Sequence, residues 1–548
     1  MANIQSLVLP IPPNFTLALK RISSLVLVFC WISCSQNDKE DLSHQVFRYN
    51  EYGNITSLDP AFSRNLPNIW ATTQLFNGLV QLDDNLNVIP DIAKDWTISD
   101  DGLNYRFILR DDVFFHEDDA FGPDKTRSVT AQDFVYSFQR LIDPQLASPG
   151  SWVMQNVKGF RAISEKVLSI DLRKPFPAFL GLLSMRYCSV VPREVIAKRG
   201  EQFRKHPIGT GPFAFKIWEE EVKLVFRKNP HYFERDSLNQ PLPYLEAIAI
   251  TFVPDKQSEF MLFLQGKLDL LNSLDNSYKD ELLTLQGTLN PEYQPSINLQ
   301  KGPYLNTEYL GFYLDHPSSV IRSPLIREAI NIGFDRKKMM TYLRNNIGFI
   351  GNKGFVPKGL GGHAEQEMFT YQPEKAKALV NTFKQESGQE AIIHLATDAN
   401  YVDLCEYLQR ELEKIGISLQ VEVMPPPTLK QARSSGQLQM FRANWIADYP
   451  DAENYLSLFY SKNFSPQGPN YTHHKNSYFD ELYEQAFTIN DPNLREKSYQ
   501  KMDSLAMSHF PLVPLYYDQI TRFVQKQVTG LTLNPLNVLK LKSVKKNK

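Results

Sequence analysis

The sequence contains little cysteine and almost no excess charge of either sign. Its 548 residues include four cysteines, and 59 basic residues face 61 acidic ones, for a net charge of −2. This near balance argues against the strongly basic field of a nucleic-acid-binding protein. No CxxC pair occurs, and no cysteine–histidine cluster has the ligand spacing of a zinc site. The sequence therefore predicts neither a metal site nor a disulfide framework.

Common enzyme motifs are also missing. HExxH, GxSxG and GxxxxGK[ST] do not occur. Residues 209–214 formally match GxGxxA, but Pro212 and the alternating pattern that follows predict a turn into a strand, not a dinucleotide site. His473 and His474 are adjacent, so they share no face of a helix or strand, and we expect solvated loop histidines. The sequence thus predicts no enzyme and no cofactor.

The chain has no apolar run long enough to span a membrane, which requires about 20 residues. Near its start, Lys20 and Arg21 precede the short apolar run 22–32, a pattern typical of a secretory signal over residues 1–33. The small residue directly before Cys34 makes this end resemble a bacterial lipobox. That resemblance implies lipidation of Cys34, followed by a polar tether over 34–43. The alternative is an ordinary secreted protein with an incidental cysteine.

What is present is the composition of a soluble globular protein, with 42% apolar and 22% charged residues. The length corresponds to about three or four domains of roughly 150 residues, or to two large lobes. Periodicity predicts a strand over 105–110 and a helix that begins after Thr130. The region 320–445 is typical of an α/β structure.

Within that region the order of elements predicts a βαβ unit. The expected strand 392–395, helix 404–415 and strand 417–423 have the lengths of a right-handed crossover between parallel strands. A further strand is expected over 438–443. Residues 445–448 then fall at its C-terminal end, where open α/β sheets bind ligands.

Nine short segments, in order and spacing, resemble family 5 of the bacterial extracellular solute-binding proteins. This family includes the oligopeptide- and dipeptide-binding components of ABC importers. The resemblance covers roughly residues 46–520, nearly all of the chain after the leader. The segments are 54–60, 75–80, 90–96, 105–113, 129–138, 207–213, 228–232, 445–451 and 476–480.

The resemblance implies an α/β, two-lobed periplasmic-binding-protein-like fold with a hinge and an extra domain on the N-terminal lobe. Domain II is then expected over 63–186 and domain III, the second ligand-binding lobe, over 293–512. The discontinuous domain I comprises 44–62, 187–292 and 513–548.

The resemblance also suggests binding residues. Asp448 matches the aspartate that binds the peptide ammonium in family members, and Arg442 matches an arginine that pairs with ligand carboxylates. The alternative for Asp448 is a turn aspartate or a helix cap after the strand, and the alternative for Arg442 is a structural salt bridge, for example with Asp448. The stretch 395–401 lacks the arginine of dipeptide binders, which argues against a strict dipeptide preference. Core or turn roles remain open for the other candidates, which are Trp445, Ala447 and Tyr449 beside Asp448, and Gly53 and Asn54 from the opposite lobe.

The function implied is the binding of short peptides in a cleft and their delivery to an ABC permease. The expected partners are the peptide, the permease–ATPase complex and the membrane that holds the lipid anchor. The protein is expected to be an exported monomer that faces the periplasm or the cell exterior. Alternatives are a non-peptide solute (a metal chelate, a cell-wall fragment or a sugar), an adhesin or signalling receptor with the same fold, and a secreted hydrolase.

Overall fold

The computed structural model describes residues 45–53, 55–273, 275 and 278–547, and its largest sheet contains strands from residues 46–50 and 512–525, which are far apart in the chain. The strands lie in the order β15-β14-β16-β12-β17-β11-β1-β10-β9-β8, and β13 pairs with β17 outside that order. Their bounds are β15 Ile417–Val423, β14 Ala391–Thr397, β16 Met440–Ile446, β12 Ile297–Phe312, β17 Leu512–Gln525, β11 Leu270–Asn272, β1 Val46–Asn50, β10 Ala247–Thr251, β9 Lys223–Lys228, β8 Phe213–Glu219 and β13 Phe349–Ile350.

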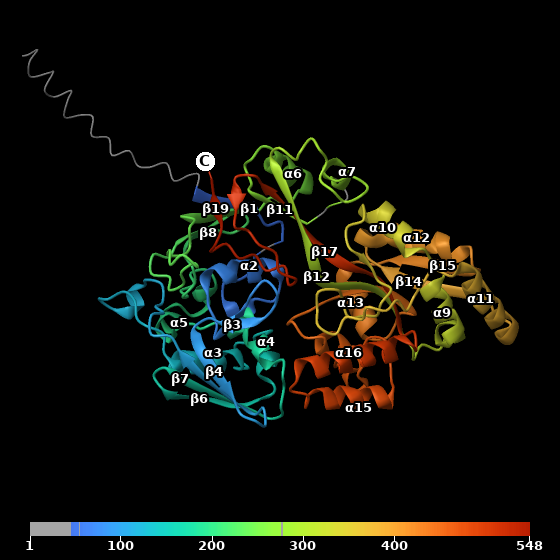
Figure 1. Cartoon of the computed structure of the whole chain (residues 1–548), viewed down its shortest axis with the longest axis horizontal. Helices are drawn as coiled ribbons and strands as arrows, with labels where there is room; N and C mark the ends of the chain where they lie inside the picture. Colours follow the sequence, from blue (N-terminus) through green and yellow to red (C-terminus); the bar gives the residue numbers. More distant parts are fainter. Residues whose placement is uncertain (1–44, 54, 274, 276–277, 548) are drawn as a thin grey trace, which may run out of the picture. The chain divides into compact units, whose positions relative to one another are not determined.

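The long strands β12 and β17 lie side by side and connect two lobes (Figure 1). Residues 522–524 of β17 pair with β11, whereas residues 306–312 of β12 pair with β16. Between these regions the β12–β17 ladder shifts register, between Pro303 and Thr307. We call strands β11, β1, β10, β9 and β8 with their attached elements the N-terminal lobe. Strands β14, β15 and β16 form the C-terminal lobe together with the helices from α8 (Ser319–Arg322) to α16 (Pro492–Met507).

The C-terminal lobe contains the βαβ unit that periodicity predicts. Strands β14 and β15 are parallel, with Ala391 opposite Ile417 and Thr397 opposite Val423. Helix α12 (Val402–Glu413) connects them. Leu412 of this helix is fully buried in the hydrophobic core that also contains side chains of β14 and β15. The predicted strand–helix–strand order is therefore confirmed, as is the next strand, β16.

The two faces of β12 separate two hydrophobic cores in this lobe. Tyr309 belongs to the core under α13 to α16, and its neighbour Leu310 belongs to the core under α9 to α12. This alternation follows from the two-residue side-chain period of a strand. The helices are α8 Ser319–Arg322, α9 Pro324–Ile332, α10 Arg336–Arg344, α11 Pro373–Ser387, α13 Pro426–Ser434, α14 Glu453–Leu456, α15 Ser477–Ala486 and α16 Pro492–Met507.

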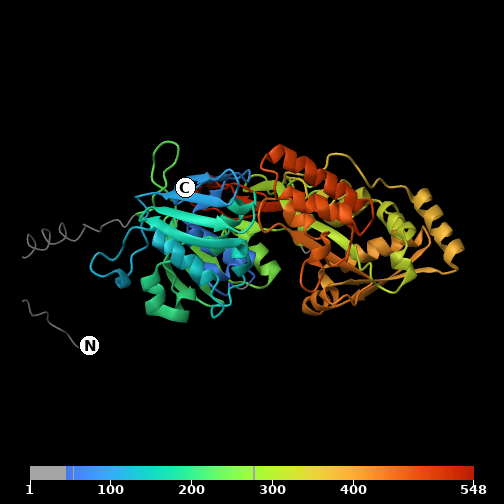
Figure 2. The ribbon, with the colours of Figure 1, turned by 90° about the horizontal axis from the view of Figure 1, so that it is seen from below.

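A second sheet, antiparallel in the order β4-β5-β7-β6, lies in the N-terminal lobe. Helix α3 (Ala131–Leu141) packs against it, and the colours of the sheet and helix run from light blue to teal in Figure 2. The backbone N–H of Thr130 donates to the Asp133 carboxylate at 2.8 Å, which caps the helix where the sequence predicts its start. The strands are β4 Ala93–Ile98, β5 Asn104–Leu109, β7 Val167–Leu172 and β6 Val157–Ser164.

Short elements complete the N-terminal lobe. Strands β2 and β3 form a hairpin, and β18 pairs with β19 near the C-terminus. The strands are β2 Val80–Leu82, β3 Val88–Pro90, β18 Val528–Thr529 and β19 Lys545–Lys546. The helices are α2 Leu66–Leu75, α4 Phe179–Leu183, α5 Arg193–Arg199, α6 Lys256–Leu264 and α7 Lys279–Leu282.

The glycine-rich segment before β8 is a turn, as predicted. An added Cβ at Gly209 would lie 2.1 Å from the carbonyl oxygen of Leu75, and one at Gly211 would lie 2.4 Å from the carbonyl carbon of Leu75. These glycines allow two backbone segments to approach closely, at the C-terminal end of α2.

The prediction of solvated histidines at 473 and 474 is wrong. His474 is buried, and its Nδ1 hydrogen-bonds the carbonyl oxygen of Phe459 at 3.1 Å. His473 stacks on the ring of Phe464 and hydrogen-bonds the Asp315 carboxylate at 2.7 Å. The loop folds back on the C-terminal lobe, so that both rings are packed despite their loop position. Among the described residues, no helix is long and apolar enough to cross a membrane.

Candidate ligand-binding site

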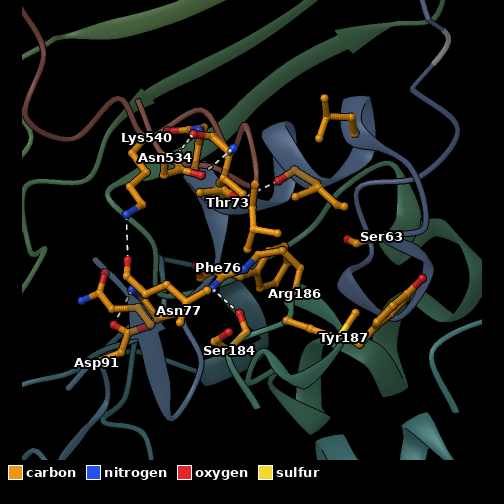
Figure 3. Close-up of a pocket in the computed structure, with 18 of the residues that line it drawn as sticks. Ser63, Thr73, Phe76, Asn77, Asp91, Ser184, Arg186, Tyr187, Asn534 and Lys540 are labelled. Atoms are coloured by element: carbon orange, nitrogen blue, oxygen red, sulfur yellow. Dashed lines mark hydrogen bonds between the residues drawn. The ribbon is translucent and has the colours of Figure 1, made fainter. Parts of the chain in front are cut away.

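A cavity of about 500 Å³ lies where the two lobes meet (Figure 3). The N-terminal lobe contributes most of its lining, from helix α2 and from residues 184–187 and 534–542. The C-terminal side contributes Tyr304 on β12 and residues 446–448 at the C-terminal end of β16. The volume lies within the range of about 300–1,000 Å³ that is typical of small-ligand sites.

Asp448 lies two residues beyond the last residue of β16 and lines this cavity. Its backbone N–H contacts Oδ1 of Asn454 at 3.4 Å, and the same oxygen accepts a hydrogen bond from the indole of Trp445 at 2.9 Å. Burial raises the pKa of the Asp448 carboxyl, and a hydrogen bond from the Asn454 side chain opposes this. No cation among the described residues forms an ion pair with Asp448, although the side chain remains accessible from the cavity. This carboxylate can therefore accept a cationic group of a ligand.

Of the residues predicted to flank Asp448, only Ala447 lines the cavity. Its N–H donates to the carbonyl oxygen of Leu305 at 3.0 Å. Trp445 and Tyr449 are not among the lining residues. The Tyr449 ring lies 6.3 Å from that of Trp152 and 6.3 Å from that of Phe176, both in the N-terminal lobe. Tyr449 therefore forms part of the contact between the lobes.

Arg442 is buried and engaged with two carboxylates. It forms an ion pair with Glu308 on β12 and lies 3.5 Å from the carboxylate of Asp398. Its guanidinium also lies 3.1 Å from the ring centroid of Tyr401. Neither carboxylate partner is Asp448. The positive charge of Arg442 is thus compensated within the protein, and its side chain is absent from the cavity lining.

The remaining predicted residues lie away from the cavity or outside the described chain. The N–H of Gly53 contacts the Glu51 carboxylate at 3.2 Å, and Gly53 does not line the cavity. Asn54 lies outside the described residues, as do Cys34, the expected signal 1–33 and the expected tether 34–43.

The N-terminal lobe contributes cavity residues that sequence analysis missed. Lys540 donates to the Leu82 carbonyl oxygen at 2.7 Å and to the Asp84 carboxylate at 3.1 Å. Lys542 forms an ion pair with Glu234. Lys540 and Lys542 are two residues apart, so in an extended segment their side chains lie on the same face. The sequence does not indicate which part of the protein that face contacts. Arg186 also lines the cavity, and no pattern in the sequence marks it.

Comparison with known proteins gives a consistent assignment. Residues 87–467 match the family described as bacterial extracellular solute-binding proteins, family 5 Middle. A probable deoxycholate-binding periplasmic protein of Escherichia coli is 26% identical over 89% of this chain and 91% of that relative. The dipeptide-binding protein of Escherichia coli is 24% identical over 92% of each chain.

Solved structures show the same fold. A periplasmic binding protein of Helicobacter pylori, in complex with the peptide STSA, is 24% identical with a TM-score of 0.75 over 92% of this chain and 98% of that one. HbpA2 of Haemophilus parasuis is 23% identical with a TM-score of 0.79 over 92% of this chain and 100% of that one. The two-lobed α/β fold predicted from the sequence is therefore confirmed.

Proposed function

Because the chain belongs to family 5 of the bacterial extracellular solute-binding proteins, we propose that its cavity binds short peptides for delivery to an ABC permease. The observation that carries this proposal is the carboxylate of Asp448, which lines the cavity without an ion-pair partner among the described residues. A peptide ammonium supplies both a positive charge and hydrogen-bond donors. Relatives described as binding dipeptides, and one solved with the peptide Met-Leu, support the same ligand class.

The cavity recognises what all peptides share. Asp448 binds the ammonium, and backbone groups beside Ala447 bind the peptide backbone without regard to its side chains. We assign positioning roles to Trp445 and Tyr449, which hold the segment around Asp448 through Asn454 and through the lobe contact. For Arg442 we favour the structural salt bridge over contact with the ligand, because Glu308 and Asp398 already compensate its charge.

Membership of the family supports a role in transport. The protein carries out no chemistry, and the partner ATPase supplies the energy for import. We propose that it is exported and anchored through lipidated Cys34, facing the periplasm or the cell exterior. One acyl chain gives only marginal membrane binding, so stable anchoring requires more than one.

A non-peptide solute is the second candidate. Apolar side chains of Leu66, Ile69 and Phe76 line the cavity, and relatives are described as binding deoxycholate and haem. In that case the fold and transport role remain, while Asp448 contacts a different polar group. A panel that contains both peptides and deoxycholate distinguishes the two candidates by which of them binds.

Isothermal titration calorimetry with the tripeptide Ala-Ala-Ala tests the proposal directly. Asp448 is exposed toward the cavity, and a hydrogen bond to a charged group contributes about 1.5–3 kcal/mol, so Asp448→Asn should weaken binding about 10- to 100-fold. N-acetylation of the peptide should weaken binding to wild-type protein to a similar extent. The control Asp100→Asn removes an exposed carboxylate in the turn after β4 and should leave affinity unchanged. Equal affinity of wild type and Asp448→Asn would refute the assignment.

A further inference from the structure

Four cationic side chains of the N-terminal lobe line the cavity, and they differ in how their charges are compensated; Arg186 and Lys540 are labelled in Figure 3, and the other two are Arg64 and Lys542. Lys540 lies 3.1 Å from the Asp84 carboxylate, and Lys542 forms an ion pair with Glu234. Arg186 has no carboxylate within ion-pairing distance among the described residues. Two of the four positive charges are thus neutralised by the protein, whereas those of Arg186 and Arg64 have no ion-pair partner among the described residues.

The Arg186 side chain is held in place by neutral groups. Its Nη1 donates to the carbonyl oxygen of Phe76 at 3.1 Å, and its Nη2 donates to the carbonyl oxygen of Ser184 at 3.1 Å. A guanidinium carries five N–H donors, so these two bonds leave donors for another acceptor. Because carbonyl groups orient the side chain without cancelling its charge, Arg186 is a preorganised anion site.

Asp91 is the acidic group that acts most strongly on Arg186, but it is bonded elsewhere. One of its carboxylate oxygens accepts from the side-chain amide of Asn77 at 2.8 Å, and the other accepts from the N–H of Gly78 at 3.0 Å. Tyr232 and Cys188 also act on the guanidinium; both are neutral acids at pH 7, and burial raises their pKa values further. The cation of Lys540 repels that of Arg186. Burial in these surroundings lowers the pKa of Arg186 from its ordinary value.

We propose that Arg186 binds an anionic group of the ligand, which in a peptide is the C-terminal carboxylate. This inference rests on the proposed peptide-binding function. Arg186 belongs to the N-terminal lobe and Asp448 follows β16 of the C-terminal lobe, and both line one cavity. A zwitterionic peptide therefore joins the two lobes through opposite ends. Ligands that lack either charge hold only one lobe by an ion pair.

Arginine suits this task because its planar fork pairs with a carboxylate through two parallel hydrogen bonds. Arg64 is the competing candidate, since it also lines the cavity and forms no ion pair among the described residues. Its side chain is exposed, however, so water already solvates its charge. An ion pair at Arg64 is consequently worth less than one at Arg186.

Calorimetry with Ala-Ala-Ala and its C-terminal amide tests the inference. Wild-type protein should bind the free acid about 10- to 100-fold more tightly than the amide, the range expected for charge-assisted hydrogen bonds. Arg186→Met should bind the free acid as weakly as wild type binds the amide, and its affinity for the amide should be nearly unchanged. Arg186→Lys should recover part of the preference. The control Arg106→Met removes an exposed arginine on β5. This variant should retain the full preference for the free acid over the amide.

The possible outcomes separate this inference from the proposed function. If the acid and the amide bind equally, peptide binding stands and the role of Arg186 is refuted. The same conclusion follows if Arg64→Met abolishes the preference and Arg186→Met does not. If neither peptide binds to wild-type protein, the proposed function itself fails, and this inference fails with it. Circular dichroism and the retained amide affinity exclude misfolding as the reason for a loss in Arg186→Met.

Discussion

Arg442 on β16 and Glu308 on β12 form a buried ion pair between neighbouring antiparallel strands. Asp398, directly after β14, lies 3.5 Å from the same guanidinium. The neighbouring strands β14, β16 and β12 thus bring these three charged side chains together. Burial raises the pKa of Glu308, and the positive charge of Arg442 opposes this.

Removal of Arg442 should therefore destabilise the protein strongly. Arg442→Met leaves Glu308 and Asp398 buried without their cation, which should cost about 3–5 kcal/mol of unfolding free energy at pH 7. Urea unfolding at neutral pH measures this cost. The control Arg410→Met breaks the exposed pair with Glu406 and should cost less than about 1 kcal/mol. Equal costs for the two variants would contradict the structural role.

Asn454 should act on ligand binding through Asp448 and not by contact. Asn454→Ala removes the acceptor shared by the Asp448 N–H and the Trp445 indole, so the carboxylate loses its fixed position. We expect about tenfold weaker binding of Ala-Ala-Ala, the size of one lost hydrogen bond to a charged group. Calorimetry should show a smaller difference between the free and N-acetylated peptides. A matched change in the same lobe, Asn463→Ala, should leave that difference intact.

His116 should make the protein sensitive to mild acid. Burial lowers its pKa to about 4, and its ring accepts from the N–H of Gly209 while its Nε2 lies 2.9 Å from the Gly211 carbonyl oxygen. The unfolded chain binds this proton near pH 6.5 and the folded chain only near pH 4, so the stability contribution is lost as pH falls through this window. The loss amounts to about 3 kcal/mol, at 1.36 kcal/mol per pH unit.

Comparison with His116→Gln isolates this contribution, because titrations at other sites are common to both proteins. The variant should be less stable than wild type at pH 7, and the gap should narrow as the pH falls to 4.5. Urea unfolding at several pH values provides the measurement. A gap that stays constant with pH would show that His116 titrates normally in the folded state.

The glycine turn before β8 should tolerate no side chain. In Gly209→Ala the added Cβ meets the Leu75 carbonyl oxygen at 2.1 Å, so the turn and helix α2 must separate. Overpacking of this kind costs about 1–3 kcal/mol or more. The control Gly159→Ala, on β6, has no atom within 4 Å of the new Cβ and should change the melting temperature little. Similar melting temperatures for the two variants would contradict the close approach.

Part of the candidate site could be predicted from the sequence. The segment around Asp448 follows a strand with a clear hydrophobic pattern, and its place at the end of that strand is local information. The partners of Arg442 could not be predicted, because Glu308 and Asp398 become its neighbours only through strand pairing. Arg186 gave no signal, since one arginine in a short turn has no periodicity.

The sequence by itself determined the βαβ unit, the capped helix after Thr130, the glycine turn and the family. Each depends on residues near one another in the chain, where spacing alone fixes which side chains share a face. Only the tertiary structure decided which charges are compensated. Lys540 meets Asp84, while Arg186 and Asp448 face one cavity from different lobes. Such pairings depend on distances of a few ångströms between distant segments, and a pattern of residue types does not encode those distances.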